Sequence, residues 1–101
     1  MGLDINLEDE RGEILATVND PTNLLRRLQE HGIVDEPQLA EIDWYGDTTF
    51  NRLQMSRFLS QWEAVVRQAE APEQVKLVNE IKELADRCQS EIHLYLKFIG
   101  D

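Results

Sequence analysis

The sequence has a single cysteine, few cations and no long apolar run. Because Cys88 has no second cysteine to pair with, an intrachain disulfide is excluded and a reducing compartment is the simpler expectation. No apolar stretch approaches the ~20 residues that span a bilayer. The first ten residues, MGLDINLEDE, lack the basic and apolar regions of a secretion signal. We therefore expect a cytoplasmic protein with no membrane partner.

Positive charge is the scarcer of the two signs. Ten Lys and Arg residues stand against twenty Asp and Glu residues, and the net charge is −10. Binding to a nucleic-acid backbone depends on clustered cations that release counterions. Anionic lipid likewise attracts basic segments. The composition therefore argues against nucleic acid and membrane as partners. With 101 residues, 42% of them apolar, the chain suits one domain over residues 1–101 with one modest core.

The first 18 residues have the pattern of a β-hairpin. Leu3, Ile5 and Leu7 alternate with polar residues, and Ile14, Ala16 and Val18 repeat the alternation. The connecting residues 9–12 are polar and end in Gly12, a residue that tolerates the positive φ of a tight turn. The pattern predicts a hairpin over residues 3–18.

A helix is predicted over residues 21–31. Asp20 suits the N-cap, and Pro21 suits the first helical position, where a missing N–H costs nothing. Leu24, Leu25 and Leu28 would share one face. After it, Ala40, Ile42 and Trp44 alternate with acidic residues, and 48–50 is β-prone, so a shorter second hairpin is predicted around a turn at 45–47.

Two longer helices are predicted over residues 52–70 and 73–89. Asn51 or Ser56 is expected to cap the first of them, and Asn51 is supported by Gln54 at the spacing of a capping box. Pro72 suits the start of the second helix. The apolar residues follow helical spacing in both segments. In the first segment these are Met55, Phe58, Leu59, Trp62, Val65, Val66 and Ala69; in the second they are Val75, Val78, Ile81, Leu84, Ala85 and Cys88.

The last apolar run, residues 91–99, has two interpretations. It either continues the preceding helix or forms a strand in which Ile92, Leu94, Leu96 and Phe98 alternate. Apolar residues on both sides of the alternation favour an interior strand. The predicted order is β-β-α-β-β-α-α-β: an α+β domain with an antiparallel or mixed sheet backed by about three helices. The predicted core consists of Leu25, Leu28, Phe58, Trp62, Val66, Val78, Ile81 and Leu96.

No catalytic, metal-binding or cofactor-binding motif is found. His31 falls at a predicted helix end, where the helix dipole favours a cation, and His93 falls within the predicted last strand. Cys88 lies on an apolar stripe and is expected to be a buried small hydrophobe. The acidic turn between the first two strands lacks EF-hand spacing. We therefore predict a protein that is not an enzyme and holds neither metal nor cofactor.

The charge is distributed unevenly along the chain. The first 47 residues contain twelve acidic and three basic residues, whereas the remainder contains eight and seven. Solubility or protection of an exposed strand edge explains such a bias, and so does complementarity to a basic partner. Between residues 30 and 47 there are six acidic residues and no base. The candidate partner-binding residues are Asp35, Glu36, Glu41, Asp43, Tyr45 and Asp47.

Three functional hypotheses follow. The first is a non-enzymatic, acidic protein-binding module, such as an immunity protein or antitoxin-like inhibitor that covers the basic surface of a nuclease toxin. The alternative is a structural or regulatory homo-oligomer or adaptor subunit, joined through the helix pair or the last strand, whose acidic face serves solubility. The third is a small enzyme that uses Asp and Glu as acid-base groups or metal ligands.

Overall fold

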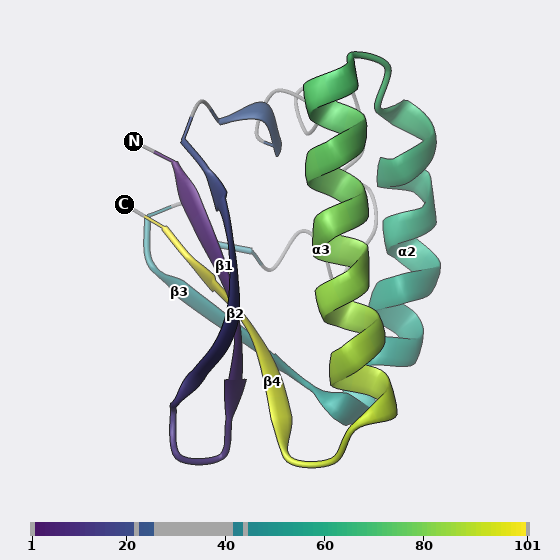
Figure 1. The fold of residues 1–101 in the computed structure, drawn as a ribbon. Coiled ribbons are helices and arrows are strands. Elements are labelled where there is room, and N and C mark those ends of the chain that lie inside the picture. Colours follow the sequence, from purple (N-terminus) through teal and green to yellow (C-terminus); the bar gives the residue numbers. More distant parts are fainter. Residues whose placement is uncertain (1, 22, 26–41, 44, 101) are drawn as a thin grey trace.

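The computed structural model describes residues 2–21, 23–25, 42–43 and 45–100. Within this part of the chain, a four-stranded antiparallel sheet with strand order β2-β1-β4-β3 packs against the helices α2 and α3, which both lie on one face of the sheet (Figure 1). The α+β class is confirmed. The described residues contain two α-helices rather than about three, and their order is β-β-β-α-α-β.

The predicted hairpin is formed by β1 (Leu3–Asp9) and β2 (Ile14–Asp20). In the turn, the Asp9 carboxylate accepts hydrogen bonds from the Arg11 and Glu13 amides, each at 2.9 Å. Gly12 has φ +82°, a left-handed conformation that glycine adopts without the steric penalty of a Cβ. Local turn chemistry and alternation therefore agree, and the prediction is confirmed.

The helix predicted over 21–31 lies mostly outside the described residues, which here end at 25. What is described corrects its start. The Asp20 carboxylate does cap, accepting from the Leu24 and Leu25 amides at 2.9 Å each. The backbone becomes helical only at Leu24, however, because Asn23 has φ 56°. Pro21 therefore lies in a turn and not at the first helical position.

The second predicted hairpin is wrong in its pairing. Its β-prone half forms β3 (Asp47–Asn51), but β3 pairs with β4 (Leu94–Ile99) at the other end of the chain. Ile42 and Asp43 are not in a strand, and residues 40, 41 and 44 lie outside the described part. The Asp43 amide donates to the Thr48 hydroxyl at 2.8 Å, a local bond that competes with a strand ladder.

The capping box predicted at Asn51 is present. The Gln54 amide donates to Asn51 Oδ1 at 3.1 Å, and the Asn51 amide donates to Gln54 Oε1 at 2.7 Å. It opens a short 3₁₀ turn, η3 (Arg52–Gln54), which leads directly into α2 (Met55–Gln68). Pro72 occupies the first turn of α3 (Pro72–Ser90), as predicted. None of the described helices is long and apolar enough to cross a membrane.

An aromatic cluster joins the sheet to α2. The Phe58 ring centroid lies 5.2 Å from that of Phe50 on β3 and 6.0 Å from that of Phe98 on β4. Trp62 stacks on Phe58 at 5.4 Å, and its indole N–H donates to the Val78 carbonyl at 3.0 Å, which ties α2 to α3. Such contacts stabilise aromatic pairs beyond the area they bury.

The predicted core is largely confirmed. Six of its residues are buried: Leu25, Phe58, Trp62, Val78, Ile81 and Leu96. Val66 is partly buried, and Leu28 lies outside the described residues. On α3 the predicted stripe is wrong at its first position, because Val75 is 39% exposed and Leu77 packs into the core in its place.

The strand predicted in residues 91–99 is confirmed, but it begins later than expected. β4 lies between β1 and β3, so it is an interior strand. His93 has φ 62°, which interrupts the extended backbone before the strand starts. Ile92 therefore leaves the apolar face of the alternation and is 65% exposed. His93 itself lies in the turn between α3 and β4, not in the strand.

Candidate partner-binding surface

The sheet has one face against the helices and one face away from them (Figure 1). On β1, Leu3, Ile5 and Leu7 are buried in the core, so the alternation turns the side chains between them to the opposite face. We call that opposite face, as far as the structure describes it, the open face. It consists of Asp4, Asn6, Glu8, Ile14, Thr17, Asn19, Asp47, Thr49, Asn51, Tyr95, Lys97 and Ile99.

Residues paired across β1, β4 and β3 lie side by side on the open face and form rows that cross these three strands. Ile99 lies between Asp4 on β1 and Asp47 on β3. In the row nearest the β1–β2 turn, Tyr95 lies beside Glu8. Each row that ends in a carboxylate thus also carries an apolar side chain from β4. Apolar centres with charged neighbours are the usual make-up of protein interfaces.

Charge separates the two layers of the molecule. The four strands and the β1–β2 turn contain seven carboxylates and two cations, Arg11 and Lys97. Helices α2 and α3 contain five carboxylates and five cations. The helical charges also pair along α3, where Lys76 contacts Glu80 at 4.0 Å and Lys82 contacts Asp86 at 3.8 Å. Most of the excess negative charge of the described residues therefore belongs to the sheet layer.

Two carboxylates of the open face are held by neighbours. Lys97 Nζ lies 3.7 Å from Asp47 Oδ2. Glu8 Oε2 accepts from the Asn6 amide at 3.5 Å, and Asn6 in turn accepts from the Thr17 hydroxyl at 2.9 Å. Asn6 is only 4% exposed, so this chain of bonds is fixed across β1 and β2. Lys97 is the only cation in the four strands, so most of this negative charge has no counter-ion within the sheet.

The candidate residues predicted from the sequence are only partly described. Asp35, Glu36 and Glu41 lie outside the described residues. Asp43 and Tyr45 lie shortly before β3, and Asp47 is the first residue of that strand. Asp47 reaches the open face, whereas the Asp43 carboxylate accepts from the Tyr45 amide at 2.9 Å and so serves the loop itself.

The loop is tied to the edge of the open face. The Gly100 amide donates to the Gly46 carbonyl at 2.7 Å, just beyond the end of β4. A Cβ at Gly46 would lie 2.8 Å from Asp43 Oδ2, so the close approach of that carboxylate depends on glycine. Tyr45 is 67% exposed. Tyr45 is therefore an exposed aromatic residue in a loop that adjoins the open face, and its role as a partner anchor stays a prediction.

Sequence reasoning missed Asp4, Glu8 and Tyr95 as parts of this surface. Alternation placed Asp4 and Glu8 on the polar side of the first hairpin, which was a usable signal. Nothing in the local pattern showed that β4 inserts between β1 and β3, and this insertion alone brings Tyr95 beside Glu8 and Asp47 onto the same face.

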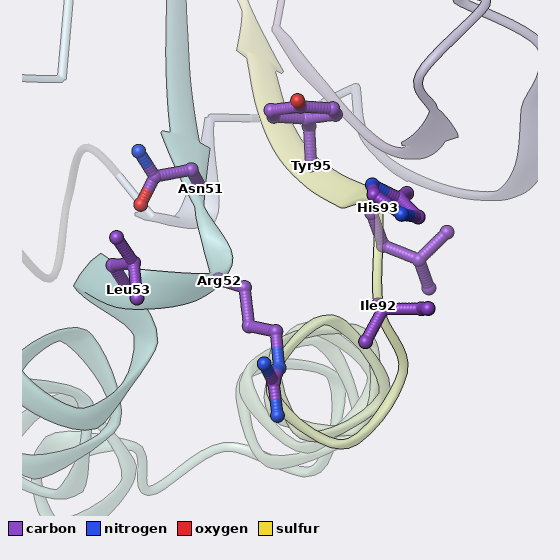
Figure 2. Close-up of a pocket in the computed structure, with 7 residues that line it drawn as sticks. Asn51, Arg52, Leu53, Ile92, His93 and Tyr95 are labelled. Atoms are coloured by element: carbon purple, nitrogen blue, oxygen red, sulfur yellow. The ribbon is translucent and has the colours of Figure 1, made fainter.

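A hollow of about 360 Å³ borders the open face where β3 ends and β4 begins. Figure 2 shows Leu53 on one side of it, Ile92 and Tyr95 on the other, and Arg52 between them. Leu53 is 88% exposed, the most of any large apolar side chain described. Two exposed aliphatic side chains thus flank one opening in the surface.

Cys88 and His93, the cysteine and the histidine that the structure describes, each contact another residue of the chain. Burial raises the pKa of the Cys88 thiol to about 11, and its Sγ donates to the Leu94 carbonyl at 3.5 Å, as expected for a buried small hydrophobe. His93 Nδ1 lies 3.5 Å from Glu10 Oε2 at the surface. In the described part of the chain no three His, Cys, Asp or Glu side chains are grouped to hold a metal ion. His31 lies outside that part.

Comparison of the chain with protein-family models, with curated proteins and with solved structures gives no match.

Proposed function

We propose that this chain is a non-enzymatic protein-binding module whose open face docks on a basic surface of its partner. The observation that carries the proposal is the separation of charge between the layers: seven carboxylates against two cations in the sheet and its turn, and five against five in the helices. Solubility requires net charge but no particular distribution of that charge between two layers, whereas a docking face requires the charge on one of them. Nucleases have basic clefts for phosphate, so an immunity protein or antitoxin-like inhibitor is the class of binder that fits.

The negative charge of the open face weakly destabilises the fold and attracts a basic partner. Neighbouring strands lie ~4.8 Å apart, so Asp4 and Asp47, with β4 between them, are separated by roughly 10 Å, close to the Debye length at physiological salt. Their mutual repulsion opposes folding weakly. A basic partner removes that repulsion and is attracted from beyond contact distance, which raises the association rate. Tyr95 and Ile99 supply apolar contact between the charges.

A homo-oligomer or adaptor, with the acidic face serving solubility, has less support. Joining through the last strand requires a free edge, but β4 is paired on both sides. Joining through the helix pair requires exposed apolar residues there, and Val75 is the only large one on α2 or α3. The other exposed large apolar side chains among the described residues lie in and around the sheet, at Ile14, Leu15, Tyr45, Leu53, Ile92 and Tyr95.

The proposal is tested by affinity capture from a lysate of the source cells with three immobilised proteins. One is the wild type. The second, the face variant, carries Asp4→Asn, Glu8→Gln and Asp47→Asn. The third, the helix variant, carries Glu63→Gln, Glu73→Gln and Glu83→Gln at exposed helical positions. Both variants lose three negative charges, so they differ only in the layer that loses them.

We expect the wild type and the helix variant to retain the same basic protein, and the face variant to retain far less of it. Elution should occur as salt rises, because contacts on an exposed rim are screened. If the partner is retained equally by all three proteins, the open face is not the docking surface. If both variants lose it equally, only net charge matters and the proposal of a specific face fails.

A further inference from the structure

The hollow beside the open face is built from side chains that folding alone does not explain. Burying a Leu or Ile side chain contributes ~1.5–3 kcal/mol, yet Leu53 and Ile92 remain 88% and 65% exposed. Single exposed apolar residues are ordinary on protein surfaces. Here two of them line one opening from opposite sides, with Arg52 between them and the partly exposed Tyr95 ring farther along, beyond His93 (Figure 2).

Hydrogen bonds hold the side chains that line the hollow in place. The capping box fixes Asn51 at the end of β3. Arg52 Nε donates to the Gln89 carbonyl at 2.9 Å, which ties the Arg52 side chain to the last turn of α3. A preformed site loses less entropy on binding than one that must be ordered.

The size and chemistry of the hollow match an aromatic side chain. About 360 Å³ is more than ten times the ~30 Å³ that one water molecule occupies in the liquid. A ring in this space contacts aliphatic groups of Leu53 and Ile92 and stacks on the planar guanidinium of Arg52, an arrangement that arginine favours.

Acidic side chains lie next to the hollow. Glu8 is beside Tyr95 in the register of β1 and β4, and Glu10 lies 3.5 Å from His93 in the hollow's wall. Because Tyr95 belongs to both the hollow and the open face, a partner seated on the face reaches the hollow without a gap. The hollow itself holds one cation, Arg52, against these two carboxylates, so complementary charge places the partner's cations where they face Glu8 and Glu10, away from the guanidinium.

We propose, resting on the function proposed above, that this hollow is the anchor site of the interface and takes an aromatic side chain of the partner flanked by Lys or Arg. The test uses two peptides of equal charge, acetyl-Lys-Lys-Phe-Lys-Lys-amide and acetyl-Lys-Lys-Ser-Lys-Lys-amide. Each is titrated into ¹⁵N-labelled wild type, the face variant and a Leu53→Ser variant. Since Leu53 is almost fully exposed, that last variant loses no core contact.

We expect the Phe peptide to shift the amide signals of residues 51–53 and 92–95 in the wild type and to bind roughly three- to five-fold more tightly than the Ser peptide. Leu53→Ser should remove that preference and leave binding of the Ser peptide unchanged. Arg52→Gln, which keeps a polar side chain but not the guanidinium, should also lower it.

Two results would overturn the anchor, and they differ in what they leave standing. If both peptides shift the open face equally and leave residues 51–53 and 92–95 unmoved, the anchor is wrong while the proposed function survives. If the Phe peptide binds the hollow equally well in the wild type and the face variant, the acidic flank contributes nothing, and both the basic neighbours of the anchor and the proposed docking face are contradicted.

Discussion

Burial determines the chemistry of Cys88. Its side chain is fully buried on α3, and its Sγ donates to the Leu94 carbonyl across the turn into β4. Nucleophilic cysteines react as thiolates, and burial in apolar surroundings disfavours the thiolate. The thiol therefore packs between α3 and the sheet. Because folding raises its pKa, the stability of the fold depends on whether the thiol is protonated.

That coupling predicts how stability depends on pH. Burial raises the pKa of the Cys88 thiol from 9.0 to about 11 in the folded protein. Between these values the unfolded chain loses the thiol proton while the folded chain keeps it. The contribution of Cys88 to the free energy of unfolding is thus complete below pH 9 and declines as pH rises toward 11. The measurement is urea unfolding at several pH values, wild type against Cys88→Ala.

The two proteins differ only at position 88. Any difference between them in how the free energy of unfolding changes with pH therefore comes from the Cys88 thiol. Wild type should lose more stability than Cys88→Ala between pH 9 and 11, while the two curves run parallel at lower pH. Parallel curves over the whole range would show that the thiol is not shielded from water in the folded protein.

At the scale of elements, α2 is held to the sheet by Phe58. Its ring contacts Phe50, Phe98 and Trp62, which come from both layers. Phe58→Ala should lower the free energy of unfolding by about 3–5 kcal/mol, because a cavity forms where three rings met. Leu53→Ala, in the adjacent η3, is the control, and its almost fully exposed side chain should make little difference. Chemical denaturation of both variants measures the two values.

Similar losses for Phe58→Ala and Leu53→Ala would contradict the packing described. The comparison also separates the two roles of this region, because η3 borders the hollow while α2 supports the core. A small effect of Leu53→Ala on stability would also show that the Leu53 side chain can be removed without unfolding the protein, which the peptide titration of Leu53→Ser requires.

Local signals predicted most of the elements but not all of their partners. The capping box at Asn51 and the proline that opens α3 act within a few residues, so the sequence shows them directly. The pairing of β3 with β4 joins residues 47–51 to residues 95–99, and no local signal carries it. The positive φ of His93 had the same consequence on a smaller scale, because it ended an alternation that otherwise included Ile92.

The candidate site followed the same rule. Net charge and its bias toward the first half of the chain were visible in the sequence, and Asp47 and Tyr45 lie at the surface as expected. The sequence did not show that Asp43 differs from Asp47 in its role, because the hydrogen bond of the Asp43 carboxylate to the Tyr45 amide within the loop is visible only in the structure. The open face exists only because two distant strands flank β4, so Asp4 and Tyr95 entered the site through topology.

At the scale of the whole molecule, the acidic layer should cost stability. The face variant replaces three carboxylates by amides of nearly the same size. Within the described part of the chain it loses one ion pair near the surface, Asp47 with Lys97, a kind of pair that contributes ~0–1 kcal/mol. At low salt, we expect the face variant to be at least as stable as the wild type in urea. The difference should shrink as salt is added. A marked loss of stability would mean that these carboxylates serve the fold rather than a partner.

The account rests on recognition of a basic surface by the open face, and the association rate of the captured partner tests this most directly. Rates would be measured by stopped flow across a range of NaCl concentrations for the wild type, the face variant and the helix variant. We predict rates that fall steeply with salt for the wild type and the helix variant, and a slower, nearly salt-independent rate for the face variant. Three curves with the same slope would contradict the assignment of the open face.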